Sequence, residues 1–194
     1  MKKFLLLISV FFLTGCVAGQ QIKFGDLPVG TQDAPLGITV MVKVDDNRDF
    51  VRSGNKTTAY IGHYRAGFGN PWDVNTYQKK ALAEIFREDL ERDLKSLGFN
   101  LGEGQDGKKL QVVIKDWNFD TYLNGKIWYD IEVAVLTKDG QQLAADTIKE
   151  TKVIEGSVWV GAKYAFEEEV PKIYADIIGR LVRQNSKILT ALKN

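Results

Sequence analysis

Apolar and polar residues alternate with a period of two in four segments of this chain, the pattern of β-strands that bury one face. The segments span residues 38–44, 110–121, 126–137 and 141–154. Asn124-Gly125 and Asp139-Gly140, dipeptides typical of tight hairpin turns, separate the last three segments. These three are therefore predicted to form an antiparallel meander.

The apolar phase of the segment at 110–121 shifts after Ile114, because the next large apolar residues are Trp117 and Phe119. A β-bulge near Lys115 would produce such a shift, and so would partial burial of both faces of the strand. We favour the bulge.

Two further segments repeat apolar residues at intervals of three and four, which predicts amphipathic helices. The first spans residues 76–97, with Asn75 or Thr76 as its N-terminal cap and Gly98 as its left-handed stop. The second is expected to begin near Val170, after a separate short helical turn, because proline at position 171 is best tolerated in a first helical turn.

This order of elements predicts an α+β fold with the succession β-α-β-β-β-α. We expect a four-stranded, mainly antiparallel sheet with two helices packed on one face, in a single domain over residues 38–194. Residues 16–37 contain four glycines and two prolines without sustained periodicity, which indicates an extended tether. A strand at the sheet edge is the alternative for this segment.

The N-terminus has the pattern of a bacterial lipoprotein signal. Lys2 and Lys3 precede an apolar stretch of ten residues, about half the length of a membrane-spanning helix, and the sequence Leu-Thr-Gly-Cys follows at 13–16. We predict that residues 1–15 are removed and that Cys16 carries acyl chains that hold the protein to a membrane. Val17 favours the outer membrane, with the domain at its periplasmic face.

Charge and cysteine content limit the partners and the covalent chemistry. The chain has 26 basic and 25 acidic residues, and loss of Lys2 and Lys3 leaves 24 minus 25, a formal charge of −1. Such a balance gives no general attraction to nucleic acid, which we exclude as a partner. Cys16 is the only cysteine, so no internal disulfide can form and stability must come from packing.

Several short motifs, taken in order, resemble the YajG-type family of proteobacterial lipoproteins. They lie at residues 13–16, 36–40, 46–48, 94–101, 128–131 and 153–156. The resemblance implies an envelope lipoprotein without assigned catalysis, and it carries no catalytic residue onto this chain. The segment between Arg52 and Tyr77 is longer and more aromatic than the family pattern.

The sequence offers little catalytic chemistry, and we predict no catalytic residue, no metal site and no cofactor. His63 is the only histidine, so zinc sites built from several histidine or cysteine ligands are excluded. Adjacent carboxylates such as residues 167–169 diverge around a helix and do not converge on one ion. The protein is therefore expected not to be an enzyme.

The stretch from Tyr60 to Trp72 is the best candidate for a binding surface. It reads as a glycine-rich loop with more large aromatic side chains than one strand or helix face could bury, and such loops suit recognition. The alternative is that its aromatic side chains fold back over one end of the core. The candidate binding residues are Tyr60, His63, Tyr64, Arg65, Phe68 and Trp72.

Two functions fit these features. The first is a non-enzymatic cell-envelope lipoprotein that binds a protein partner, or acts as an accessory or assembly component, through this stretch or an exposed sheet edge. The second is a lipoprotein that binds a small molecule, a muropeptide or a lipid in a pocket of aromatic and polar side chains.

Overall fold

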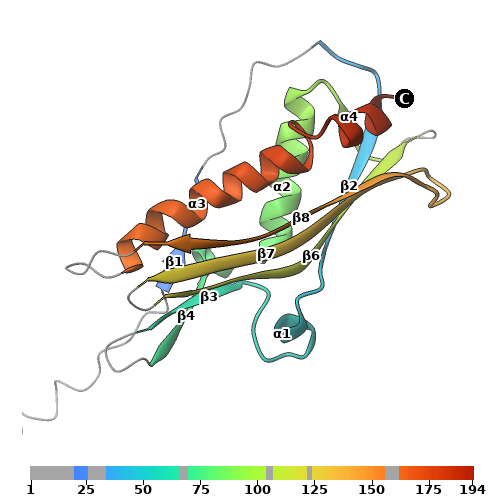
Figure 1. The fold of residues 1–194 in the computed structure, drawn as a ribbon. Helices are drawn as coiled ribbons and strands as arrows, with labels where there is room; N and C mark the ends of the chain where they lie inside the picture. Colours follow the sequence, from blue (N-terminus) through green and yellow to red (C-terminus); the bar gives the residue numbers. More distant parts are fainter. Residues whose placement is uncertain (1–19, 26–33, 66–69, 104–106, 122–123, 156–161) are drawn as a thin grey trace, which may run out of the picture.

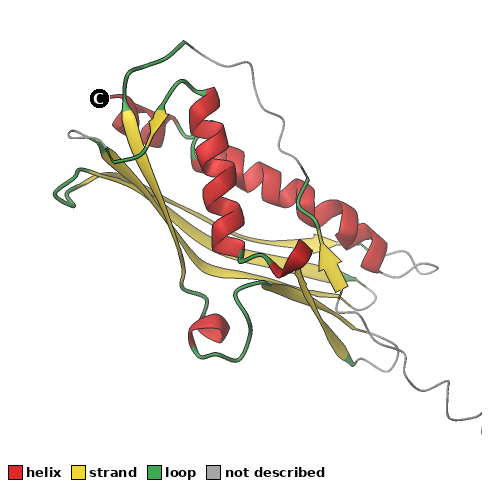
Figure 2. Ribbon diagram, turned by 180° about the vertical axis from the view of Figure 1, so that it is seen from behind, coloured by secondary structure: helices red, strands yellow, loops and turns green. Residues whose placement is uncertain are grey.

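The computed structural model describes residues 20–25, 34–65, 70–103, 107–121, 124–155 and 162–194. The chain forms one mixed, curled sheet of eight strands with helices α2, α3 and α4 on one face and the short helix α1 on the other (Figures 1 and 2). We call the face that carries α2 to α4 the helix face and the opposite one the open face. The predicted signal peptide and Cys16 lie outside the described residues.

The elements follow one another along the chain as β1 (Gln20–Ile22), β2 (Thr39–Asp46), α1 (Asp49–Arg52), β3 (Tyr60–Arg65), β4 (Pro71–Thr76), the 3₁₀ turn η2 (Tyr77–Lys79), α2 (Leu82–Ser96), β5 (Asn100–Leu101), β6 (Lys108–Thr121), β7 (Gly125–Leu136), β8 (Gln142–Ile154), α3 (Ala162–Leu181) and α4 (Ser186–Lys193).

The predicted β-α-β-β-β-α order, with a four-stranded sheet and two helices, is wrong. The sheet has eight strands because β1, β5 and the β3–β4 hairpin join the four segments that the alternation predicted. These added strands are two to six residues long, too short for a period of two to stand out. Strands β1, β2 and β3 also make parallel pairings, so the sheet is mixed.

The three long strands of the meander agree closely with the alternation. β6 pairs with β7 and β7 pairs with β8, both antiparallel; β7 begins at Gly125, and Asp139 and Gly140 lie in the connection between β7 and β8. The β6–β7 register shifts between Ile114 and Asp116, which confirms a bulge at Lys115. The bulge restores the alternation, so Ile114 and Trp117 both lie in the core.

Helix α2 confirms the predicted stop but not the predicted start. Gly98 has φ +85°, its N–H donates to the carbonyl of Lys95, and the N–H of Phe99 donates to that of Leu94, which is a Schellman cap. The helix begins only at Leu82, because Tyr77–Lys79 forms a separate 3₁₀ turn.

The C-terminal helix is divided differently from the prediction. Helix α3 begins at Ala162, eight residues before Val170, and carries Pro171 in its interior. It ends at Leu181, and Asn185 caps a second helix, α4, by accepting a hydrogen bond from the N–H of Ile188. The periodic apolar stripe thus spans two helices that share one buried face.

The segment predicted as a tether contains part of the fold. Gln20–Ile22 is an edge strand parallel to β4, the alternative considered for this segment. Two residues later Phe24 is buried, with its ring stacked on that of Tyr174 at a centroid distance of 4.2 Å and edge-on to Trp117 at 6.0 Å. The described chain is therefore part of the core before the predicted domain start at residue 38.

Candidate interaction surface

The sheet divides at β6, and this fork positions the segment that the sequence singled out. On one side of β6, β2 pairs with Lys108–Ile114 and β3 pairs only with Asp120 and Thr121. No strand accompanies Lys115–Phe119 on that side within the described chain. A side chain, that of Arg48, occupies the space between the two diverging strands.

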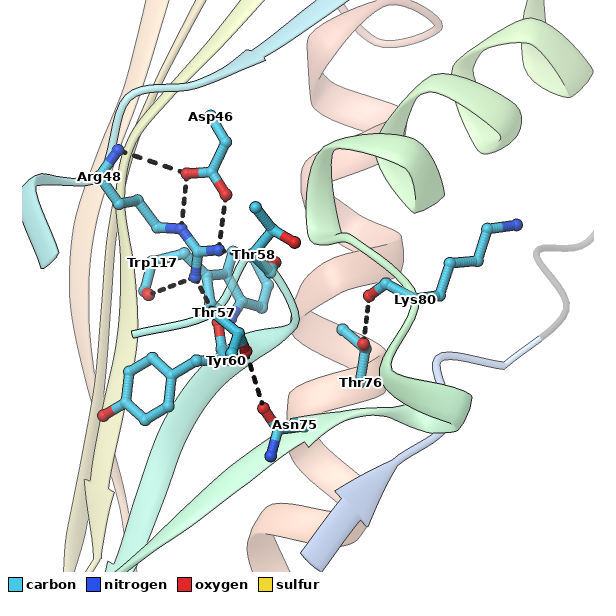
Figure 3. A network of polar contacts seen from close by, with 9 residues as sticks. All are labelled: Asp46, Arg48, Thr57, Thr58, Tyr60, Asn75, Thr76, Lys80 and Trp117. Atoms are coloured by element: carbon cyan, nitrogen blue, oxygen red, sulfur yellow. Dashed lines mark hydrogen bonds and ion pairs between the residues drawn. The ribbon is translucent and has the colours of Figure 1, made fainter. Parts of the chain in front are cut away.

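Arg48 has no exposed side-chain surface and joins all three strands of the fork (Figure 3). Its Nε and Nη2 donate to the two carboxylate oxygens of Asp46 at 2.8 and 2.7 Å. Nη2 also donates to the carbonyl of Thr58 at 3.1 Å, and Nη1 donates to the carbonyls of Tyr60 and, at 3.5 Å, Trp117. The guanidinium thus supplies the donors that a neighbouring strand would otherwise provide.

The aromatic stretch beyond the fork is a β-hairpin and not a loop. Strands β3 and β4 pair antiparallel with Tyr64 opposite Trp72, and Phe68 lies outside the described residues. A register shift between Tyr60 and Gly62 places the two buried tyrosines on opposite faces of the sheet. The hairpin therefore divides the predicted binding residues between two surfaces.

The two tyrosines pack against different parts of the molecule. The ring of Tyr64 contacts that of Phe119 on the helix face, at a centroid distance of 5.7 Å. The ring of Tyr60 contacts Phe50 of the α1 segment on the open face, edge-on at 5.3 Å, with Lys56 over the ring. Folding back over the core, the alternative considered for these aromatic side chains, describes Tyr64, whereas Tyr60 is buried beneath the α1 segment.

The polar residues of the hairpin form a chain of hydrogen bonds on the open face. His63 contacts Asp120 through Nε2 at 3.1 Å and the Tyr60 hydroxyl through Nδ1 at 3.1 Å, and that hydroxyl donates to Asn118 at 3.2 Å. Burial raises the pKa of Tyr60 to about 12. The paired hydrogen bonds from Arg65 lower the pKa of Asp120.

Both ring nitrogens of His63 have partners in this arrangement, Nε2 in Asp120 and Nδ1 in Tyr60. Within the described ranges, no group of three or more His, Cys, Asp or Glu side chains is arranged to hold a metal ion. No helix in the same part of the chain is long and apolar enough to cross a membrane.

The described surface includes several hollows. One of about 260 Å³ lies between the α1 segment and β4 and includes Tyr60, Lys56 and Asp73. A second, of about 210 Å³, lies where β6 begins, beside Met41 and Lys109. The third is larger and adjoins a sheet edge.

That edge is strand β8, which pairs only with β7 among the described strands. Lys187 donates to the carbonyl of Ala145, and the N–H of Thr147 donates to the side chain of Asp146, so the backbone of Ala145 and Thr147 faces away from β7. Alternate residues of a strand direct their backbone groups to the same side. The N–H and C=O groups of Lys149, Thr151 and Val153 therefore also face outward.

These three residues form an open edge at the end of β8, which we call the open β8 edge. No hydrogen bond to their outward backbone groups is formed by the described part of the chain. The side chains of Val153 and Lys149 are largely exposed, Val153 by 60%. Unpaired strand backbone of this kind can accept a further strand.

Helix α3 borders the open β8 edge and holds the neighbouring charges in place. Arg180 contacts Glu150 at 2.6 Å, and Glu150 also accepts a hydrogen bond from the Tyr129 hydroxyl at 2.8 Å. The Arg180 hydrogen bond lowers the pKa of Glu150. A groove of about 420 Å³ continues from the edge along Asp146–Ile148, against the corner between α3 and α4.

The sequence predicted neither the fork nor which edge of the sheet is open. Arg48 follows a strand in a run of polar residues, so it reads as part of a solvated turn. The edge has no pattern of its own, because alternation shows which face of a strand is buried but not which neighbours it has. A sign of an edge was nevertheless present in the lysines and threonines of residues 147–152.

Comparison with known proteins supports the fold alone. No family model and no curated protein matches the chain. An uncharacterised protein of known structure shares 11% identity over 86% of this chain and all of its own, with a TM-score of 0.50. A Xanthomonas campestris protein of the DUF330 family matches at 11% identity, over 83% of this chain and 90% of its own, with a TM-score of 0.49.

Proteins described as lipoproteins are among the similar structures. Lipoprotein GNA1162 from Neisseria meningitidis matches at 9% identity, over 73% of this chain and 94% of its own, with a TM-score of 0.32. At these identities the matches say nothing about partners or ligands. Membership of the YajG-type family therefore stays a prediction.

Proposed function

We propose that this protein is a non-enzymatic lipoprotein of the cell envelope that binds a protein partner through the open β8 edge. Acyl chains on Cys16 hold it to the outer membrane, with Val17 directing it there and the domain at the periplasmic face. The observation that carries the proposal is the row of outward backbone groups at Lys149, Thr151 and Val153.

The backbone groups select the kind of partner. Donors and acceptors that recur at every second residue match the backbone of another extended chain, which is how strand addition achieves affinity. The flanking charges are internally paired, Glu150 with Arg180 and Lys149 with Asp130. The proposed partner is therefore an extended segment of another protein, recognised through its backbone and by contacts with α3.

The small-molecule alternative receives less support from the geometry. The hollow beside the predicted aromatic residues contains Tyr60 but not Tyr64 or Trp72, because the hairpin turns those side chains elsewhere. Polar side chains such as Lys56, Asp73 and Asn75 line it. Ligand pockets are usually deeper and more apolar.

Replacing Thr151 with proline tests strand addition. Proline removes an N–H that faces outward, so it leaves the β7–β8 ladder intact while blocking one bond to an added strand. A photoreactive residue at position 149 should crosslink one envelope protein in cells, and Thr151→Pro should abolish the adduct. Thr151→Val, which keeps the N–H, should retain it.

The controls identify which part of the proposal fails. Thermal melting of the proline variant must match that of the valine variant, so that loss of the adduct reports binding and not unfolding. An adduct that survives Thr151→Pro would rule out strand addition. An adduct of twice the chain mass would show that the edge pairs with a second copy of this protein and not with a separate partner.

A further inference from the structure

We propose that the corner of the sheet where β3 ends and β4 begins lies against the lipid headgroups of the membrane that holds Cys16. We call this corner, formed by Arg65, Pro71 and Trp72, the hairpin corner. The inference rests on the lipidation of Cys16 in the proposed function, and it adds the orientation of the domain and a second contact with the bilayer.

The connection between the lipid and the sheet is short. Strand β1 begins at Gln20, four residues after Cys16. A fully extended chain spans at most about 3.6 Å per residue, so the two Cα atoms are separated by no more than about 14 Å. A connection this short cannot hold the domain at a distance from the bilayer.

Strand β1 is the neighbour of β4, the second strand of the hairpin. It runs parallel to β4 at the sheet edge, with Gln20 beside Val74 (Figure 1). The N-terminal end of β1 therefore lies toward the end of β4 that carries Pro71 and Trp72. With strands about 4.8 Å apart and a rise of about 3.3 Å per residue, the Cα of Trp72 lies about 8 Å from that of Gln20.

Adding the two distances places the Cα of Trp72 within about 22 Å of that of Cys16. The thioether of Cys16 must lie at the level of the lipid headgroups, because its acyl chains enter the hydrocarbon. The hairpin corner therefore lies within about 22 Å of the level of the headgroups, whichever way the domain tilts about its anchor.

The hairpin corner exposes side chains that suit the surface of a bilayer. Trp72 is one of the large apolar side chains that remain exposed, by 38%, and Pro71 beside it is exposed. Arg65, opposite Pro71 in the hairpin, is also partly exposed, with Nε and Nη2 of its guanidinium paired to Asp120. Indole and guanidinium groups both favour the interface between lipid and water, where phosphates and apolar chains meet.

A fluorescent probe in two positions tests the orientation. The thiol of Cys16 is blocked by the thioether to its lipid, so a cysteine introduced as Trp72→Cys can be labelled alone with a polarity-sensitive dye in the mature, acylated protein. Leu143→Cys is the matched control, because Leu143 is similarly exposed, by 44%, at the far end of β8. Pro71→Cys provides a second position at the corner if Trp72→Cys lowers the melting temperature.

The labelled proteins are reconstituted in phosphatidylcholine vesicles that contain lipids with a nitroxide at the headgroup. We expect severalfold stronger quenching of the dye at positions 72 and 71 than at position 143. Equal quenching at all three positions in protein that floats with the vesicles would overturn the inference and leave the anchor intact. Protein that lacks the acyl mass and does not float would overturn the anchor, and this inference with it.

Discussion

Two arginines near the β3–β4 hairpin make the same contact in opposite surroundings. Arg48 and Arg65 each direct Nε and Nη2 at the two oxygens of one aspartate, Asp46 and Asp120, at distances between 2.6 and 2.8 Å. The exposed fractions of the side chains are 0% and 8% in the first pair but 37% and 29% in the second.

The difference shows that burial, and not contact geometry, determines how much stability is lost when an ion pair is broken. Water can replace either partner of Arg65 and Asp120 on the open face, so their pairing adds little to stability. Water does not reach Arg48, whose loss would remove the cationic partner of Asp46 and one donor each from the carbonyls of Thr58 and Tyr60. The buried pair of Arg48 and Asp46 therefore stabilises the fork, whereas the exposed pair of Arg65 and Asp120 contributes little.

The largest expected effect follows from removing the buried arginine. Arg48→Ala should lower the free energy of unfolding by about 3–5 kcal/mol, because Asp46 loses its cationic partner and the carbonyls of Thr58 and Tyr60 each lose one donor. Denaturant titration of the folded protein measures this change. Arg87→Ala, which removes an exposed arginine paired with Glu91 on α2, is the matched control and should change little. Similar losses of unfolding free energy in the two variants would show that burial does not set the contribution of Arg48.

The second-largest effect is expected at Gly62, where strand β3 packs closely against Phe119 of β6. A Cβ on Gly62 would lie 2.4 Å from the ring of Phe119, which Phe166 contacts in turn. Gly62→Ala should therefore destabilise the protein by about 1–3 kcal/mol, as overpacking does. Gly25→Ala, at a glycine with open space around it and without a positive φ, provides the control for the substitution itself. An unchanged midpoint for Gly62→Ala would mean that the ring moves aside freely.

The exposed pair should matter less, and in a pH-dependent way. Because Arg65 lowers the pKa of Asp120, the pair stabilises the protein above the pKa of the unfolded aspartate, and this contribution is lost as pH falls through the folded value. Arg65→Ala should lower the melting temperature slightly at pH 7 and not at all at pH 2. High salt should reduce the difference at pH 7. A loss as large as that for Arg48→Ala would contradict the comparison.

The smallest effect is expected at Asp116, on the open face beside Trp128. Burial raises its pKa, so its ionised form is less favourable in the folded protein, and stability present at low pH is lost as pH rises through the folded pKa. Asp116→Asn should therefore raise the melting temperature slightly at pH 7 and leave it unchanged near pH 3. Melting curves at the two pH values measure the difference, and a drop at pH 7 would show that the carboxylate makes a contact that the amide cannot replace.

The long elements could be predicted from the sequence because their patterns are local. Seven or more alternating residues defined β2, β6, β7 and β8, and the phase shift after Ile114 located the bulge. Four turns of apolar spacing with a glycine stop located α2. The short strands could not be found, because their two to six residues contain no period and their pairing partners are distant in the chain.

The candidate surface shows the same division. The sequence directed attention to Tyr60–Trp72 by composition, but a hairpin with a register shift buries Tyr60 and Tyr64 and leaves Trp72 exposed. The open β8 edge could not be predicted from composition, because it depends on the absence of a ninth strand beside β8 among the described residues. Composition reports which side chains are available and not which of them remain at the surface.

The sequence by itself determined where amphipathic segments run, where the meander turns, and that Cys16 stands in a lipoprotein processing pattern. Each is encoded by neighbouring residues, so each can be recognised without knowledge of distant contacts. Only the tertiary structure decided that Arg48 replaces a missing strand, that β8 has an unpaired edge, and that the chain joins the sheet four residues after Cys16. These depend on which distant segments become neighbours, and that is settled by packing of the whole chain around one core.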